Sequence, residues 1–422
     1  MILVCREHGW EETSDGEKAD LVLLNTCSVR ETAETRALGR IAHYAGLKKK
    51  RKRKFILVIA GCMAQRLGGE LIKKFPQIDY VMGTHARSFF PLILNASQDG
   101  TKAQIEADET PAFSFSHLHL EEGQYRSFIP IMHGCNNFCS YCIVPYVRGR
   151  EVSRSPENIL QEIRLVGEKG VREITLLGQN VNSYRWDDSL DFSALLKSAA
   201  DEAAKSGIKW IRFLSANPRN FSSKTIEVIA ENRAFCRHLH LPVQHGSNNM
   251  LKAMNRGYTK EDFLDLVSEI REVMPEITLS TDILVGFPGE TEEDVDETLS
   301  LMEEVKFLYS YMYHFNPREG TKAFYLPNRI EDGVKGDRLS RVIALQKEHT
   351  AELLKKRIGS REVVFVEGIS RKNADELITR TERDEMAAVP GHKSMIGNFG
   401  SLTLSALKGN TFRAKELVLN RI

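Results

Sequence analysis

The stretch HGCNNFCSYCIVPYVRGR, residues 133–150, contains three cysteines in a C-x3-C-x2-C array. It overlaps the end of the apolar string FIPIMHG, which predicts a β-strand. Three thiolates on one short loop can hold three irons of a cubane 4Fe–4S cluster and leave the fourth iron without a protein ligand. Such an open iron can bind and reduce a small molecule. Soft thiolates favour iron–sulfur clusters or zinc over hard cations, so Cys135, Cys139 and Cys142 are predicted metal ligands.

The spacing of these cysteines, with Tyr141 directly before the last of them, resembles the signature of radical S-adenosylmethionine (SAM) enzymes. The longer string through Arg150 is similar to that of the methylthiotransferase branch. The resemblance implies that the open iron chelates SAM and that an electron from the cluster cleaves SAM to a 5′-deoxyadenosyl radical. A zinc knuckle with His133 as fourth ligand is the alternative. A disulfide has less support, because nothing else in the chain looks secreted.

The composition describes an ordinary soluble protein. The chain has 422 residues, enough for two or three domains, and its formal net charge is +1. A balance this close to zero argues against electrostatic RNA binding over the whole surface, so RNA contacts would need local basic patches. No apolar run is long enough to span a membrane, and the N-terminus lacks the layout of a signal peptide. We therefore expect a cytoplasmic protein without membrane contact.

Residues 1–96 are predicted to form an open parallel α/β domain. The runs LVLLNTC (21–27) and FILVIAGC (55–62) are short and almost wholly apolar, as expected of parallel strands buried on both faces. Each run ends in a cysteine, Cys27 or Cys62. Open parallel sheets bind their ligands at the carboxyl edge, so we expect these two cysteines to be neighbours.

The strings NTCSVRETAE and AGCMAQR resemble the second and third cysteine motifs of the methylthiotransferase N-terminal domain, which holds an auxiliary 4Fe–4S cluster. The resemblance implies Cys27 and Cys62 as its ligands. The family's first cysteine ends an opening strand, whereas MILVCREHGW matches the end of the helix after that strand. Cys5 is expected inside a helix as an incidental half-buried thiol. Either the start of the chain is displaced or the auxiliary cluster is incomplete.

The run KKKRKRK, residues 48–54, has three interpretations: a solvated loop, an RNA phosphate-contacting patch or a nuclear address. The RNA interpretation assigns phosphate contacts to Lys49, Lys50 and Arg51. Residues 97–124 are polar and lack periodicity, which predicts an interdomain linker.

Residues 125–358 repeat a strand–loop–helix pattern. The six predicted strands are FIPIMHG, EITLLGQ, WIRFLSA, HLHLPVQ, TLSTDILVGF and LYSYMYHF. The first helix is predicted to open at Ser155 and Pro156, a good N-cap followed by proline. Further helices are predicted at 191–206, 222–232, 259–273 and 291–305. Six βα units are too few for a full eight-stranded barrel, so the pattern predicts a partial (βα)6 barrel that is open to a macromolecular substrate.

Polar strings follow the predicted strands, and barrel enzymes place their function at the carboxyl ends of strands. The strings are GQNVNSY (178–184), SANPRN (215–220), PVQHGSNN (242–249), GFPGET (286–291) and FNPREGTKA (315–323). GQNVNSY resembles the version found in tRNA methylthiotransferases. The resemblance also implies a set of SAM-binding residues: Gln179, Ser215, Gln244, Asp282 and Arg148.

Three further residues lie in or near these strings. Asn217 stands where the family commonly has histidine, and His245 where it commonly has serine. Both are compatible with a polar cup. Cys236 lies in an apolar strand entry and is expected in the core.

Along residues 359–422, apolar and polar residues alternate as in short antiparallel strands, with Gly and Asn at the turns. This pattern predicts a small antiparallel β-barrel, and it resembles the TRAM domain, an RNA-binding module. The candidate phosphate contacts are Arg371, Lys372, Arg380, Arg383, Lys408 and Arg413. Exposed polar surface is the alternative for each of them.

The resemblance implies a tRNA methylthiotransferase that converts N6-(dimethylallyl)adenosine at tRNA position 37 to its 2-methylthio form. Two 4Fe–4S clusters and SAM are the expected cofactors. The expected partners are the tRNA anticodon loop and an electron-donor reductase, and the protein is expected to be a monomer. One alternative is the same chemistry on a ribosomal-protein aspartate or on threonylcarbamoyladenosine. The other is a non-catalytic iron–sulfur protein that binds RNA.

Overall fold

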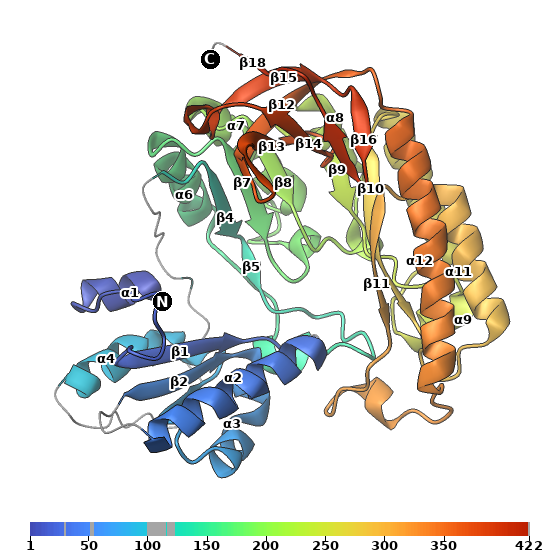
Figure 1. The fold of residues 1–422 in the computed structure, drawn as a ribbon. Coiled ribbons are helices and arrows are strands. Elements are labelled where there is room, and N and C mark those ends of the chain that lie inside the picture. The colour runs from blue at the N-terminus through green and yellow to red at the C-terminus, as the bar shows by residue number, and fades with distance from the viewer. Residues whose placement is uncertain (29–30, 51–54, 99–114, 116–122, 421–422) are drawn as a thin grey trace. The chain divides into compact units, whose positions relative to one another are not determined.

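The computed structural model describes residues 1–28, 31–50, 55–98, 115 and 123–420 (Figure 1). Arg51 and most of the predicted linker lie outside the described residues. The chain forms two compact units. The first unit contains Met1–His119, His133–Val152 and Asn316–Phe324, and the second contains Leu120–Met132, Ser153–Phe315 and Tyr325–Ile422.

The first unit begins with an α/β domain built on a parallel sheet of order β1-β2-β3. Its elements are α1 (Ile2–Glu7), β1 (Leu21–Thr26), α2 (Glu31–Lys50), β2 (Ile56–Gly61), α3 (Cys62–Lys74), β3 (Tyr80–Met82), η1 (Ala86–Phe89) and α4 (Phe90–Gln98). Leu57 and Ile59 of β2 pack with residues of α2 and α3. Val58 and Ala60 pack with residues of α4 on the opposite face. The predicted burial of this strand on both faces is confirmed.

The cysteine-rich stretch also belongs to the first unit. Its elements are β5 (Met132–His133), α5 (Val144–Arg148) and β6 (Val152–Ser153), with β5 and β6 paired, and the later segment of the unit runs into η4 (Lys322–Tyr325).

The second unit contains six parallel strands in two sheets of order β4-β7-β8 and β9-β10-β11. The strands are β4 (Arg126–Pro130), β7 (Glu173–Leu177), β8 (Trp210–Phe213), β9 (His238–His240), β10 (Thr278–Val285) and β11 (Tyr309–His314). A parallel bridge between Ile211 and Phe235 joins β8 to the residues before β9. These are the six strands that the sequence predicts, and the α/β class with parallel sheets is confirmed.

Helices follow the strands of the second unit (Figure 1). They are α6 (Pro156–Glu168), η2 (Val181–Ser183), α7 (Phe192–Lys205), η3 (Pro218–Asn220), α8 (Ser223–Glu231), α9 (Asn248–Ala253), α10 (Lys260–Val273), α11 (Glu292–Val305) and α12 (Asp332–Lys355). The Ser155 side chain caps α6 by accepting from the Asn158 N–H at 3.3 Å, with Pro156 at the first helical position. In the described residues, no helix is long and apolar enough to cross a membrane.

The C-terminal residues form a seven-stranded sheet of order β16-β17-β14-β13-β12-β15-β18. Its elements are β12 (Arg361–Ser370), β13 (Asn373–Thr381), β14 (Met386–Pro390), η5 (Lys393–Met395), β15 (Phe399–Thr403), β16 (Ala406–Lys408), β17 (Thr411–Arg413) and β18 (Val418–Leu419). All pairings are antiparallel except β14–β17. The expected closed barrel is not found among the described strands, because the short strands β16 and β18 end the order without pairing with each other.

This sheet packs against the amino ends of the six parallel strands within the second unit. The Trp210 and Phe399 ring centroids are 4.8 Å apart, and the Tyr309 hydroxyl donates to Asp384 at 2.7 Å. A closed ring of alternating charges adds to the contact; its members are Arg126, Glu173, Arg212, Asp384, Arg380 and Glu367. The amino ends are thereby covered.

Candidate functional site

The three clustered cysteines lie on a loop between β5 and α5 in the first unit. Cys135 and Cys139 are buried, Cys142 is half-buried, and all three thiols are free of disulfides. The Cys135 N–H donates to the Gly149 carbonyl at 3.2 Å, and the Cys142 N–H donates to the Cys139 carbonyl at 2.9 Å. These backbone bonds shape the loop from within.

Glycine is required where the loop begins. Gly134 has φ of +80°, and a Cβ there would lie 2.0 Å from the Arg150 carbonyl oxygen. The two ends of the stretch can approach this closely only without a side chain.

Aromatic and charged contacts support the same loop. The Arg150 guanidinium lies 4.4 Å from the centroid of the Phe138 ring, and Phe138 meets Tyr146 edge to face at 5.8 Å. The Asn136 N–H donates to Glu151 at 3.1 Å, and the Glu151 N–H donates back to the Asn136 side chain at 3.2 Å. The protein itself therefore holds the loop in place.

The donor set of this loop fits an iron–sulfur cluster. It offers three thiols, and in a cubane cluster each thiolate binds a different iron. Burial raises the pKa of the Cys135 thiol, so the thiolate that binds iron needs stabilisation by positive charge. Among the residues that the structure describes, no three His, Cys, Asp or Glu side chains are placed to share one metal ion.

The predicted auxiliary ligands directly follow neighbouring strands. Thr26 of β1 pairs in register with Gly61 of β2, so Cys27 and Cys62 both come next at the same sheet edge. Cys27 is exposed and Cys62 is buried. Gly61 has φ of +95°, and a Cβ there would lie 2.4 Å from the Thr26 carbonyl oxygen. The predicted proximity of the two segments is confirmed.

Cys5 lies in α1 and packs, half-buried, against the core beside α4. Burial raises the pKa of its thiol. The helical, half-buried placement expected from the sequence is confirmed.

Positive charge gathers around Cys62 and the cysteine loop. Burial, and then the charge of Arg148, lowers the pKa of His133 to about 3 and also lowers the pKa of His85. Burial lowers the pKa of Arg87, with a further contribution from Arg148 and an opposing one from Cys62. Arg148, a predicted SAM contact, is therefore part of a cationic group that lies near both sets of cysteines.

An ion-pair network beside Cys27 was not predicted from the sequence. Glu34 binds Arg66 at 2.5 Å and Arg318 at 3.4 Å, and Arg66 donates to the hydroxyl of the buried Ser28 at 2.8 Å. The residues lie in the three quoted strings NTCSVRETAE, AGCMAQR and FNPREGTKA. Their clustering in those strings was the available signal.

In the second unit, the predicted SAM-binding residues lie at the carboxyl ends of successive strands. Gln179 and Ser215 follow β7 and β8, and Gln244 follows β9 and bridges to Ile283 beside Asp282 of β10. Ser215 and Gln244 have φ of 65° and 75°. This left-handed conformation is uncommon for residues other than glycine and clusters at functional sites.

The two unusual positions in these strings are structural. His245 is fully buried and contacts Glu290 at 3.2 Å and the Thr298 hydroxyl at 3.0 Å. Buried Asn217 exchanges backbone hydrogen bonds with the Asn182 side chain at 2.7 and 2.8 Å. Both residues hold loops in place. Cys236 is buried in a cluster with Trp210, as predicted.

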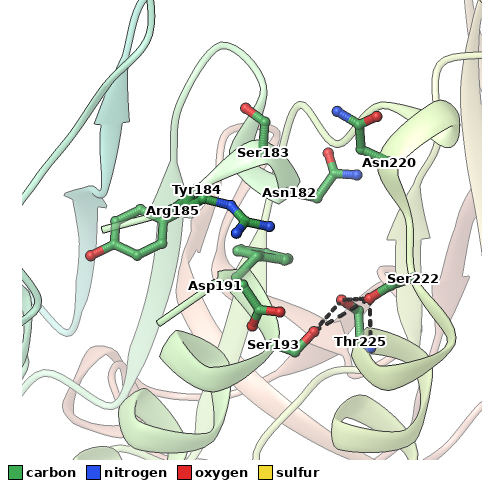
Figure 2. Close-up of a pocket in the computed structure, with 10 residues that line it drawn as sticks. Asn182, Ser183, Tyr184, Arg185, Asp191, Ser193, Asn220, Ser222 and Thr225 are labelled. Carbon is green, nitrogen blue, oxygen red and sulfur yellow. Dashed lines mark hydrogen bonds between the residues drawn. The ribbon is translucent and has the colours of Figure 1, made fainter. Parts of the chain in front are cut away.

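A polar pocket of about 260 Å³ lies beside these strand ends (Figure 2). Figure 2 shows the hydroxyls of Ser193, Ser222 and Thr225 joined by hydrogen bonds of 2.9, 3.0 and 3.4 Å. Arg185 and Asp191 also line it. The lining suits a small polar group.

The predicted RNA contacts differ in whether they already form ion pairs. Lys49 and Lys50 are exposed at the end of α2, and Arg371 and Lys372 are exposed between β12 and β13. Arg413, in contrast, binds Glu376 at 2.8 Å. Arg380 belongs to the charge ring, and Arg383 binds Glu276 at 2.8 Å. These three arginines already form ion pairs within the fold.

Two family models match the chain. Residues 129–302 match the radical SAM superfamily, and residues 1–83 match an uncharacterised protein family, UPF0004. The chain is 50% identical to the tRNA-2-methylthio-N(6)-dimethylallyladenosine synthase of Treponema denticola, over 98% of this chain and 95% of that protein. It is 46% identical to the protein of the same name from Treponema pallidum, over 98% of this chain and 94% of that protein.

A solved structure shares the fold. The radical SAM methyltransferase TsrM of Kitasatospora setae, with cobalamin and a 4Fe–4S cluster bound, superimposes with a TM-score of 0.57 at 18% identity. The match covers 76% of this chain and 68% of that one.

Proposed function

This chain belongs to the tRNA-2-methylthio-N(6)-dimethylallyladenosine synthase family of radical SAM enzymes, and we propose that it converts N6-dimethylallyladenosine at position 37 of tRNA to the 2-methylthio form. The observation that carries this proposal is the 50% identity over almost the full length of both chains. The three thiols of one loop, none of them in a disulfide, supply the matching donor set.

The chemistry explains why a radical enzyme is needed. C2 of adenine carries an unactivated C–H bond that is too strong and too weakly acidic for a general base. The chain is a radical SAM enzyme that uses 4Fe–4S clusters and SAM. When bound, the cluster supplies the electron that cleaves SAM. We assign Cys135, Cys139 and Cys142 as its ligands.

Cys27 and Cys62 are the proposed ligands of the auxiliary cluster. Their support is the register of β1 and β2, which brings both residues to one sheet edge. Arg87 and Arg148 place positive charge near Cys62 and the cysteine loop. Positive charge stabilises thiolate ligands, so these residues favour metal binding before any substrate arrives.

Gln179, Ser215, Gln244 and Asp282 are the proposed polar contacts of SAM, together with Arg148. The unusual φ angles at Ser215 and Gln244 support this assignment. Such angles cost free energy and persist where the surroundings require a particular side-chain or backbone direction. The side chains would orient the cofactor by hydrogen bonding.

The tRNA contacts are proposed at exposed basic residues. Lys49, Lys50, Arg371 and Lys372 are available for phosphate, and the C-terminal sheet would act as an RNA-binding module similar to a TRAM domain. Arg413 would first have to leave Glu376. The target base must leave the stack of the anticodon loop, which is easier from a single-stranded loop. We place this reaction in the cytoplasm, in a monomer that receives electrons from a reductase.

Mass spectrometry of tRNA nucleosides from a strain that lacks the gene tests the function. The 2-methylthio nucleoside should disappear and N6-dimethylallyladenosine should accumulate. The wild-type gene should reverse this, and a gene carrying Cys139→Ala should not. An unchanged amount of the 2-methylthio nucleoside in the deletion strain would contradict the proposal.

A further inference from the structure

Among the described residues, the helices cover one face of the six parallel strands (Figure 1), and we call the opposite face the inner face. Phe213 of β8 meets Phe192 of α7 at 5.4 Å, so its neighbour Leu214 faces the other way. On β11, the Ser310 hydroxyl donates to Gln346 of α12, which places Tyr311 on the inner face.

Side-chain alternation also shows which residues of β4 lie on the inner face. Ser127 and Ile129 are buried, whereas Phe128 between them is exposed. Side chains alternate along a strand, so Phe128 lies on the inner face. Phe128 also shares this face with Arg126, whose guanidinium reaches Glu367 of the C-terminal sheet at 2.7 Å.

The inner face is covered at its amino end and open at its carboxyl end. Glu173 and Trp210, at the strand starts, are almost fully buried near the C-terminal sheet. Toward the strand ends, large apolar side chains become accessible: Phe128 is 57% exposed, Leu214 42% and Tyr311 48%. An exposed apolar patch often marks a binding site, and these three side chains share the inner face.

Tyr311 is held in a defined orientation. It pairs in register with Asp282, a proposed SAM contact, and its ring meets His240 and Tyr309 edge to face, each at 5.7 Å. Nearly half of the side chain remains exposed despite these contacts. An aromatic ring held at its edges can stack against a nucleobase.

We propose that these three side chains bind the target nucleoside, with Tyr311 stacking on the adenine and with Phe128 and Leu214 contacting the N6-dimethylallyl group. This inference rests on the proposed function, because that substrate carries a five-carbon hydrocarbon on a base. Burying such a group against apolar side chains is favourable. The two apolar residues would therefore select the prenylated adenosine over the unmodified one.

Equilibrium binding to two anticodon stem-loops tests this: one carries N6-dimethylallyladenosine at position 37 and the other carries plain adenosine there. The full chain, loaded with iron and sulfide and given SAM, should bind the prenylated RNA about tenfold more tightly. Phe128→Ala and Leu214→Ala should each reduce this preference to about twofold by weakening only the prenylated complex. Tyr311→Ala should weaken both complexes about tenfold, because every base can stack.

Leu165→Ala is the matched control, since Leu165 is 39% exposed on α6 and Leu214 is 42% exposed on the inner face. It should leave both dissociation constants unchanged. Equal binding of the two RNAs by the wild type, or an equal loss for both RNAs in Phe128→Ala, would overturn the inference. Product formation by the wild type is measured in parallel. If the wild type prefers the prenylated RNA but makes no 2-methylthio product, the proposed function is refuted and the inference about binding is not.

Discussion

Cys62, the first residue of α3, shares a small buried cluster with Val147 of α5. The Thr84 hydroxyl also donates to the Val147 carbonyl. The strand end that carries a proposed auxiliary ligand therefore packs directly against the helix that follows the cysteine loop. Protein packing, in addition to any metal, fixes these two segments relative to each other.

Val147→Ala should destabilise the protein by about 1–2 kcal/mol, because it removes buried methyl groups and leaves a small cavity. We expect lower iron retention as well, since the helix beside the loop loses its packing partner. Urea unfolding and iron analysis after desalting check this. Val363→Ala is the control, because Val363 is exposed on β12. Wild-type stability in Val147→Ala would show that the contact does not hold the segments together.

Removing each set of cysteines in turn should distinguish the roles of the two clusters. The triple variant Cys135→Ala, Cys139→Ala, Cys142→Ala should hold about four irons per chain instead of about eight, and it should produce no 5′-deoxyadenosine. The double variant Cys27→Ala, Cys62→Ala should still cleave SAM but should not form the methylthio product. Loss of SAM cleavage in the double variant would contradict this division of roles.

Gln244→Gly should stabilise the fold and weaken SAM binding. Glycine adopts a φ of 75° without strain, so we expect about 0.5–1 kcal/mol of added stability. The lost carboxamide should weaken SAM binding about tenfold, as expected for one hydrogen bond to a charged group. Asn328→Gly, at φ 58° outside the proposed site, should leave SAM binding unchanged. Unchanged SAM affinity in Gln244→Gly would remove this residue from the site.

Local sequence signals predicted the elements well and the long-range contacts poorly. Ser155 and Pro156 indicated where α6 begins, because capping depends on residues near in sequence. The neighbouring ends of β1 and β2 followed from their apolar runs. The engagement of Arg380 with Glu367 could not be predicted, because the two residues meet only when β12 pairs with β13.

The candidate site shows the same limit. Spacing alone identified the cysteine loop, since its ligands are close in the chain. The burial of His245 against Glu290 and Thr298 depends on residues more than forty positions away. No local pattern distinguishes such a structural histidine from one that lines a pocket.

Glu173→Gln should cost about 3 kcal/mol of stability. Glu173 is almost fully buried between Arg126 at 2.8 Å and Arg212 at 3.1 Å. The substitution removes one of the two carboxylates that Arg126 and Arg212 each contact, and losing a charge partner at a buried site is costly. Glu352→Gln, which breaks the exposed pairs with Lys306 and Lys356, should have little effect by comparison. Equal effects of the two variants on the urea midpoint would contradict the role of the charge ring.

His238 should make stability depend on pH. Burial lowers the pKa of its imidazole to about 3, below the value of about 6.5 in an unfolded chain. Between these values the unfolded chain binds a proton that the folded protein does not, so stability falls as pH drops. From pH 7 to pH 5 the wild type should lose about 2 kcal/mol more than His238→Asn. Parallel urea unfolding curves at both pH values check this, and identical losses would contradict it.

The measurement that tests the central claim most directly is the yield of 5′-deoxyadenosine from anaerobically reconstituted protein mixed with SAM and a strong reductant. The account predicts 5′-deoxyadenosine from the wild type and none from Cys142→Ala. A wild-type protein that holds iron and sulfide but yields no 5′-deoxyadenosine, or that holds zinc in the cysteine loop, would contradict it.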